Sequence, residues 1–275
     1  LSVNGNATLR HSTANAEKTG HFDLNVGSKK IASVTSVSYN DFGDLRMGSD
    51  GPEEYLKKLD VIREGGKDVI VVNKDSLVQV PSGYSQLNLM QKFRFAVSEN
   101  WDVQYAFHYS ETSEYSRYDR HIRYRNGLPR YGEWKYGPQK WLMNQLTLTH
   151  NSTGGLYDQM SIRLAQQGFE ESRIDRDINK STRHIKTEKV SAYSLNMDFS
   201  KTISDHGKIN YGIEGVINDV QSIGVDEDIV LNTTVPGATR YPQATWSSYA
   251  SYINFDHRFS DKVNVQIGSR YNHFV

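Results

Sequence analysis

The residues best suited to binding chemistry gather between Ser113 and Gly137, where arginine alternates with tyrosine and tryptophan. Guanidinium groups form paired hydrogen bonds with carboxylates and phosphates, and aromatic rings offer flat surfaces to planar or sugar ligands. This composition indicates a loop that binds an anionic ligand, although a solvated loop or a contact with surface phosphates would use the same residue types. The candidate ligand-binding residues are Arg117, Tyr118, Arg120, His121, Arg123, Tyr124, Arg125, Trp134 and Tyr136.

Two acidic runs are candidates for calcium binding. Carboxylate oxygens are the hard donors that Ca²⁺ prefers, so Asp226, Glu227 and Asp228 in VDEDIV form a candidate metal site. Asp175 and Asp177 in RIDRD are a similar pair. Spacing alone does not separate such a site from a solvated run of charges.

Catalytic motifs are absent. The sequence has no G-x-S-x-G, H-E-x-x-H, Walker or Rossmann glycine pattern, and the lack of cysteine excludes disulfides and thiolate chemistry. His108, His121 and His184 could ligate haem iron, or could be ordinary hydrogen-bonded histidines. Lys+Arg and Asp+Glu both number 32, so no net charge favours nucleic acid. We therefore expect no enzyme activity, no resident cofactor and no nucleic-acid partner.

Segments in which apolar and polar residues alternate must position these candidate sites. In QKFRFAVSENWDVQYAFHYS (residues 91–110), Phe93 and Phe95 alternate with Lys92 and Arg94, and a similar alternation resumes after a short turn. A period of two predicts strands, here an antiparallel hairpin with one apolar and one polar face.

The same alternation recurs along the chain and predicts about eleven strands. Short turns and long links alternate between them without exception, and one long link has a possible helical turn around Glu53 to Arg63. An up-and-down meander with all its short turns at one end is typical of a bacterial outer-membrane β-barrel. A Greek-key sandwich has no reason to place its short and long connections at opposite ends. The short turns fall near residues 28–30, 98–100, 151–155, 204–207 and 259–262, and the long links near 40–85, 112–139, 170–187 and 219–246.

The polar face favours a water-filled interior. A Lys or Arg facing lipid at the bilayer midplane would cost ~2–4 kcal/mol, so charges in mid-strand belong in a lumen. The mean hydropathy is −0.65, and no run approaches the ~20 apolar residues of a membrane helix. The residues expected to face the lumen are Lys92, Arg94, Gln104, His108, Arg163, Gln167, Asn196, Asp198, Asn210, Glu214, Asn264, Gln266, Arg270 and Asn272.

Three stretches resemble TonB-dependent outer-membrane receptors, in particular the cobalamin, haem and siderophore receptors of Bacteroidetes-like bacteria. They are Ser12 to Ser49, which contains NDFGDLRMGS, then Val80 to Phe95, and Val265 to Val275. The resemblance implies a place in the bacterial outer membrane and a barrel of roughly 22 strands. The family's plug domain, TonB box and C-terminal barrel half are not recognisable here, and no signal peptide is visible. Residues 1–275 are therefore expected to be a partial β-barrel domain.

The same resemblance implies that external loops capture a nutrient complex and that TonB drives its uptake. The expected partners are TonB, outer-membrane lipid and lipopolysaccharide, and a complex such as iron–siderophore, haem or cobalamin. Half a barrel has unpaired edges, so taken alone it should need a partner or detergent. The main alternative is a secreted or periplasmic β-sandwich carbohydrate-binding module, with Phe93, Phe95, Phe107 and Phe255 in a closed core; a passive porin is the third interpretation.

Overall fold

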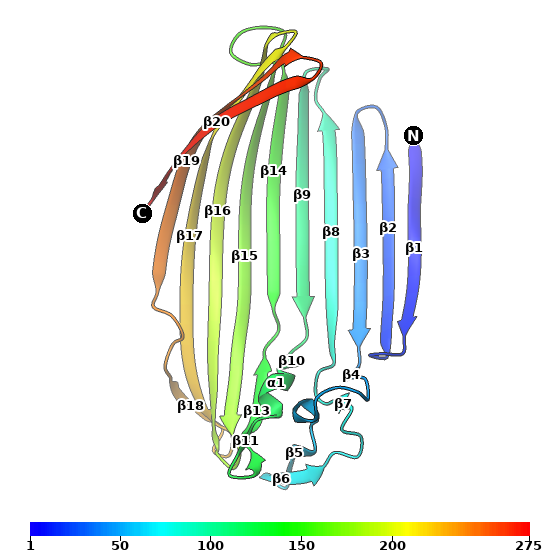
Figure 1. Ribbon diagram of the computed structural model, residues 1–275, viewed down its shortest axis with the longest axis vertical. Coiled ribbons are helices and arrows are strands. Elements are labelled where there is room, and N and C mark those ends of the chain that lie inside the picture. The colour runs from blue at the N-terminus through cyan, green and yellow to red at the C-terminus, as the bar shows by residue number, and fades with distance from the viewer.

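The alternating segments are β-strands, and they form one broad antiparallel sheet in which the strands follow chain order (Figure 1). The computed structural model describes residues 1–275. Eleven strands make up the continuous wall, which confirms the expected number. They are β1 (Ser2–Ser12), β2 (Glu17–Gly27), β3 (Ile31–Phe42), β8 (Tyr84–Ala96), β9 (Trp101–Thr112), β14 (Lys140–Asn151), β15 (Gln159–Asp177), β16 (Thr182–Ser204), β17 (Gly207–Asp228), β19 (Ala244–Ser260) and β20 (Val263–Phe274).

Short elements gather at one end of this wall (Figure 1). Three of them extend the large sheet, and the others form two-stranded pairs or single helical turns. The strands are β4 (Leu45–Arg46), β5 (Leu59–Glu64), β6 (Lys67–Val72), β7 (Val78–Gln79), β10 (Tyr115–Ser116), β11 (Tyr124–Arg125), β12 (Leu128–Pro129), β13 (Tyr131–Tyr136) and β18 (Thr233–Pro236), and the helical turns are η1 (Glu53–Tyr55) and α1 (Tyr118–His121). None of the helices is long and apolar enough to cross a membrane.

The connections are sorted between the two ends of the wall, as expected. At one end only short turns occur, and the long connections 43–83 and 113–139 both lie at the other. The strict alternation of short and long is wrong, however, because the long-loop end also has two tight turns, 13–16 and 178–181. The short turns at the opposite end are 28–30, 97–100, 152–158, 205–206 and 261–262.

Two expected long links are largely strand. The segment 170–187 is the far part of the β15–β16 hairpin, whose strands have 19 and 23 residues. Similarly, β17 continues to Asp228 before residues 229–243 connect it to β19. In these extensions both faces carry polar side chains, so hydropathy no longer alternates, but pairing with neighbouring strands keeps the backbone extended.

The helical turn expected at Glu53 to Arg63 is mostly wrong. Only η1 is helical, and β5 pairs with β6 as a hairpin instead. Gly65 and Gly66 join these two strands with positive φ values of 57° and 76°, a backbone conformation that glycine adopts at little cost. The sequence interpretation also missed β1, whose asparagines and glycine hide the period-two pattern.

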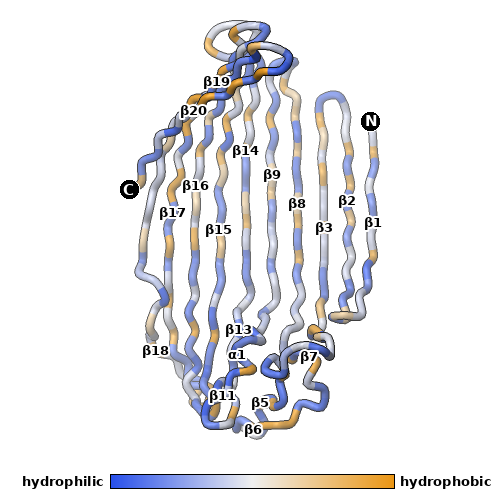
Figure 2. The backbone as a smooth tube through the Cα atoms, in the orientation of Figure 1, coloured by the Kyte–Doolittle hydropathy of each residue, from blue (hydrophilic) through white to orange (hydrophobic).

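The strand registers separate an apolar face from a polar face. One polar row runs from Gln104 through Thr147, Arg163 and Asn196 to Glu214. The registers place all fourteen residues expected to face a lumen on this polar face. Figure 2 shows the corresponding alternation of hydrophilic and hydrophobic residues along each strand. One apolar row consists of Val103, Leu148, Ile162, Met197 and Ile213.

No protein layer covers the apolar face. Phe93 and Phe95 are 50% and 46% exposed, and the only buried hydrophobic residues are Tyr131 and Trp134 in the loop region. A β-sandwich would bury its apolar face against a second sheet. The carbohydrate-binding sandwich is therefore wrong as a fold.

Candidate functional site

The candidate site is built on β13, which continues the wall at its long-loop end. β13 pairs with β15 on one side and with β10 on the other. Trp134 lies opposite Asp175 and Tyr136 opposite Arg173, so both rings share the polar face with Arg163 farther along β15. The sequence YGEWKY thereby places its aromatic side chains on the face that carries the charged rows.

Three rings of β13 each have arginine stacked over them, and we call this set the ring–arginine cluster. The guanidinium carbons of Arg117 and Arg120 lie 5.1 and 5.4 Å from the ring centre of Trp134. Trp134 is only 8% exposed, and a cation over the face of a largely desolvated ring is attracted by ~1–2 kcal/mol. The other two stacks are Arg173 over Tyr136 at 5.4 Å and Arg130 over Tyr131 at 4.8 Å.

The positive charges of this cluster are unevenly compensated. Arg117 donates from Nε and Nη2 to the two oxygens of Asp119 at 2.8 and 2.7 Å, and this pairing raises the pKa of Arg117. The hydrogen bonds from Arg117 likewise hold the pKa of Asp119 below its usual range. Arg130 and Arg173 form no ion pair, and the buried Nε of each has no hydrogen-bond acceptor. These two guanidinium groups therefore have no direct carboxylate contact.

An aromatic row leads away from the cluster along the polar face. Tyr136 is 5.2 Å from Tyr115, which is 5.7 Å from Tyr84, and Tyr84 is 5.0 Å from Phe42 (ring centres). Burial raises the pKa of the Tyr115 hydroxyl, which therefore stays protonated and can donate a hydrogen bond. Trp134 stands edge-on to Tyr136 at 5.4 Å and completes a continuous row of aromatic contacts.

Residues 143–274 match the sequence profile of the outer membrane protein beta-barrel family. The fold of the whole chain is similar to that of the copper transporter OprC, with a TM-score of 0.69 and 10% identity over 98% of this chain and 36% of that one. The sheet has the fold of an outer-membrane β-barrel wall. It belongs in the bacterial outer membrane, and the resemblance to TonB-dependent receptors is confirmed at the level of the fold.

Two further solved structures have the same wall. A G324V mutant of the ferric enterobactin receptor PfeA from Pseudomonas aeruginosa has a TM-score of 0.62 and 9% identity, over 99% of this chain and 39% of that one. The FrpB iron transporter from Neisseria meningitidis has a TM-score of 0.61 and 11% identity, over 99% and 40%. The chain thus spans two fifths of these structures or less. A search of curated proteins finds no match.

The barrel fold determines what each face of the wall contacts. The apolar face of the wall meets lipid, the polar face lines the lumen, and the long-loop end is extracellular. On β9 the outward-facing residues run from Trp101 through Val103 and Tyr105 to Glu111, a span that matches the ~9–11 residues of a membrane-crossing strand. The ring–arginine cluster therefore lies on the lumenal face, beyond the extracellular edge of the membrane.

The structure brings together about half of the predicted ligand-binding residues. Arg117, Arg120, His121, Trp134 and Tyr136 meet in the cluster. The Nε2 atom of His121 lies 2.9 Å from the carbonyl oxygen of Trp134, and burial lowers the pKa of this imidazole, so His121 is a neutral structural residue.

The other four predicted residues point elsewhere. Tyr118 donates from its hydroxyl to the carbonyl oxygen of Tyr55 at 2.7 Å. Arg123, Tyr124 and Arg125 lie exposed at the β11–β12 hairpin and stack on none of the three rings; the carbonyl oxygen of Arg123 accepts from the N–H of Arg130 at 2.8 Å.

Sequence reasoning missed several members of the site. Arg130 and Tyr131 adjoin the predicted set, and their Arg-Tyr pairing was the available signal. Arg173 and Tyr84 come from distant strands, and no local pattern shows that pairing of β13 with β15 brings Arg173 to Tyr136.

The acidic run does not form a shared metal site. Asp226, Glu227 and Asp228 alternate along β17, and each carboxylate has its own partner: His184 at 2.7 Å, Arg183 at 3.1 Å and Ser181 at 2.9 Å respectively. No group of three or more potential ligands is close enough to hold a metal ion. The geometry gives no support to calcium here, and His184, expected in a loop, lies in β16.

Proposed function

We propose that the chain forms the wall and extracellular loops of a TonB-dependent receptor for energy-coupled uptake of a nutrient complex across the outer membrane. The polar lumenal face provides a wet path, and the ring–arginine cluster stands at its extracellular entrance. Residues 1–275 form a partial barrel domain in this proposal, and TonB acts through a TonB box that this sequence does not contain. The proposal assigns no catalytic role to the chain.

The observation that carries this proposal is the pair of guanidinium groups, Arg130 and Arg173, stacked on tyrosine rings without any carboxylate partner. Arg130 has the Asp175 carboxylate only at longer range, and Arg173 has no ion pair. Two cations without a direct carboxylate contact, beside flat rings, favour an anionic, ring-bearing complex. A ferric siderophore or haem fits this description better than cobalamin, which has no net negative charge. Outer-membrane lipid and lipopolysaccharide surround the wall as its remaining partners.

Uptake by intact cells tests the proposal. The complete receptor gene is expressed in a bacterium that lacks its own receptors for iron complexes and cobalamin, and radiolabelled ferric siderophores, haem and cobalamin are supplied separately. We expect accumulation of an anionic iron complex that stops when an uncoupler collapses the proton gradient or when TonB is deleted. Accumulation that survives both treatments would indicate a passive pore instead, and uptake of cobalamin alone would contradict the anionic substrate.

A further inference from the structure

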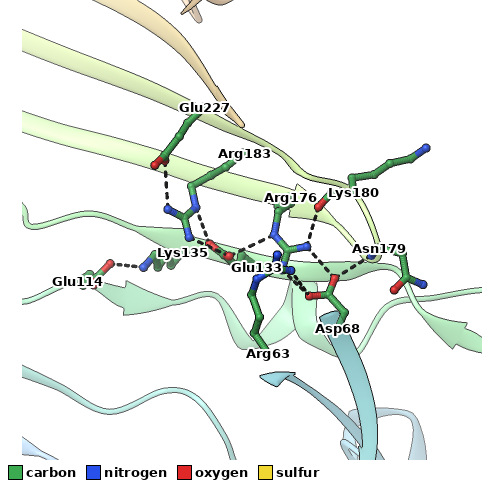
Figure 3. A network of polar contacts seen from close by, with 10 residues as sticks. All are labelled: Arg63, Asp68, Glu114, Glu133, Lys135, Arg176, Asn179, Lys180, Arg183 and Glu227. Carbon is green, nitrogen blue, oxygen red and sulfur yellow. Dashed lines mark hydrogen bonds and ion pairs between the residues drawn. The ribbon is translucent and has the colours of Figure 1, made fainter. Parts of the chain in front are cut away.

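A buried ion pair joins two loops at the extracellular end of the wall (Figure 3). Arg176 donates from Nη1 to Oδ2 of Asp68 at 2.7 Å and from Nη2 to Oδ1 at 2.9 Å. The two side chains are 1% and 0% exposed. Asp68 also accepts from the backbone N–H of Asn179 at 2.7 Å and from Arg63 at 3.0 Å, so its charge is fully coordinated.

The pair is part of a larger, charge-balanced network (Figure 3). Arg176 donates from Nε to Glu133 at 3.1 Å, and Arg183 donates from Nε to the other oxygen of Glu133 at 2.8 Å. Arg183 also reaches Glu227 at 3.1 Å. Glu133 lies next to Trp134 in β13, so the network and the ring–arginine cluster share one strand.

Residues 43–83, which we call the strap, cross the end of the wall to reach this network. The strap leaves the sheet at β3 and returns at β8, whereas Arg176 lies on β15, with β9 and β14 between them. Strands are ~4.8 Å apart, so the strap reaches sideways over about 15 Å. On the way β5 contacts β12 and β13, and Tyr55 accepts the hydrogen bond from Tyr118.

The Asp68–Arg176 contact is the only ion pair between the strap and the rest of the protein. The other ion pairs of the strap are internal, such as Arg46 with Asp75 at 2.5 Å, which is about half exposed. Room for the pair depends on Gly132. A Cβ atom there would lie 2.6 Å from Nη2 of Arg176 and 3.0 Å from Oδ2 of Asp68.

We propose that the strap is a closing element fastened by the Asp68–Arg176 pair, and that release of this pair swings residues 43–83 away from β13. This inference does not depend on the proposed ligand-binding function. When the pair separates, Asp68 keeps Arg63 within the strap and Arg176 keeps Glu133 on the wall, so each charge retains a partner. What opening loses is the two-bond contact between Asp68 and Arg176 and the hydrogen bond from the N–H of Asn179.

Proteolysis of the full-length protein in its outer membrane tests the fastening without any ligand. Trypsin cuts an opened strap after the exposed Lys67 and Lys74. We expect Asp68→Asn to speed this cleavage at least tenfold, since it removes the charge while keeping the shape. Asp75→Asn is the matched control, because it breaks an exposed pair within the same strap and should leave the rate within about twofold. Equal rates for wild type, Asp68→Asn and Asp75→Asn would overturn the proposal.

Distance measurements provide a second, independent test. The chain has no cysteine, so Glu64→Cys in β5 and Lys180→Cys beyond β15 give unique sites for spin labels. We expect one narrow distance distribution in the otherwise wild-type protein and a longer, broader one with Asp68→Asn or Gly132→Ala. If both variants keep the narrow distribution, the pair does not fasten the strap.

Ligand binding separates this inference from the proposed function. If the strap opens in Asp68→Asn and an anionic iron complex binds, both proposals are supported. A strap that opens while no anionic complex binds contradicts only the proposed function and leaves the fastening established. If the strap stays closed in Asp68→Asn while the anionic iron complex binds normally, only the inference about the strap is contradicted.

Discussion

At the scale of residues, the site combines stacked cations with rings rather than a conventional ion-pair network. Arg117 is neutralised by Asp119, whereas Arg173 and Arg130 stay free to meet a ligand. A ligand is therefore expected to bring negative charge to Arg173 and Arg130. His121, which looks like a ligand residue in the sequence, instead supports the backbone of Trp134.

Replacing Arg173 tests this assignment. Arg173→Gln removes a cation that stacks on Tyr136 and has no carboxylate partner, so folding should be little affected. A hydrogen bond to a charged group contributes ~1.5–3 kcal/mol, and we expect roughly a ten- to hundredfold weaker binding of the anionic complex. Equilibrium binding to outer-membrane preparations measures this. Arg258→Gln, which changes an exposed arginine at the opposite, short-turn end of the wall, should bind normally; equal affinities for both variants would contradict the site.

The pH response of the strap follows from its carboxyl groups. Burial alone would raise the pKa of Asp68, but hydrogen bonds from Arg176 and the N–H of Asn179 outweigh it and hold that pKa below its usual range; the pKa of Glu133 is lowered similarly. A carboxyl group with a lowered pKa stabilises the closed state above its ordinary pKa of ~4, and this contribution is lost as the pH falls through the lower value.

We therefore expect the spin-label distance across the strap to be constant from about pH 5 upward and to lengthen only below pH ~4. The Asp68→Asn variant, which has no group to titrate at this position, should show no such transition. Opening between pH 6 and 8 in the wild type would instead implicate a histidine and contradict this account.

At the scale of elements, each wall strand has lipid on one side and lumenal water on the other, so its two faces tolerate different substitutions. Phe95 and Phe107 share the lipid-facing side, whereas Arg94 faces the lumen and pairs with Asp102 at 2.6 Å. A charge on the lipid side must enter hydrocarbon, but a lumenal charge stays in water.

Phe107→Arg should therefore cost ~2–4 kcal/mol and block membrane assembly, and Phe95→Arg, nearer the short turns, should cost less but act in the same direction. Arg94→Gln should be tolerated, because a half-exposed ion pair contributes only ~0–1 kcal/mol. Heat-modifiable migration of the full-length protein in gels reports assembly. Equal tolerance of all three substitutions would reverse the assignment of the two faces.

At the scale of the whole molecule, stability comes from strand pairing instead of a protein core. Only 13 of 275 residues are buried, so lipid and lumenal water replace the interior of a globular domain. β16 is hydrogen-bonded along its length to β15 and β17, but β1 and β20 each have a single neighbour in the sheet. Unpaired edges are sites of association with other strands.

Hydrogen exchange on the 275-residue chain in detergent should reflect this gradient. Amides of β16 should exchange slowest, and the outward-directed amides of β1 and β20 fastest, because only the latter have no partner strand. Without detergent we expect the chain to associate rather than stay monomeric, which sedimentation can measure. Uniformly slow exchange in a detergent-free monomer would mean that the edges are closed on each other.

The sequence by itself determined the local features: most of the strands, the two faces and the end of the wall at which the long loops lie. These depend on side-chain alternation, which neighbouring residues in the chain display directly. Only the tertiary structure decided which loop residues form the site and which fasten the strap. Strand pairing brings Arg173 to Tyr136 and Arg176 to Asp68 from segments far apart in the chain, and the outer halves of β15 and β16 are extended because their neighbours pair with them, not because their sequence alternates.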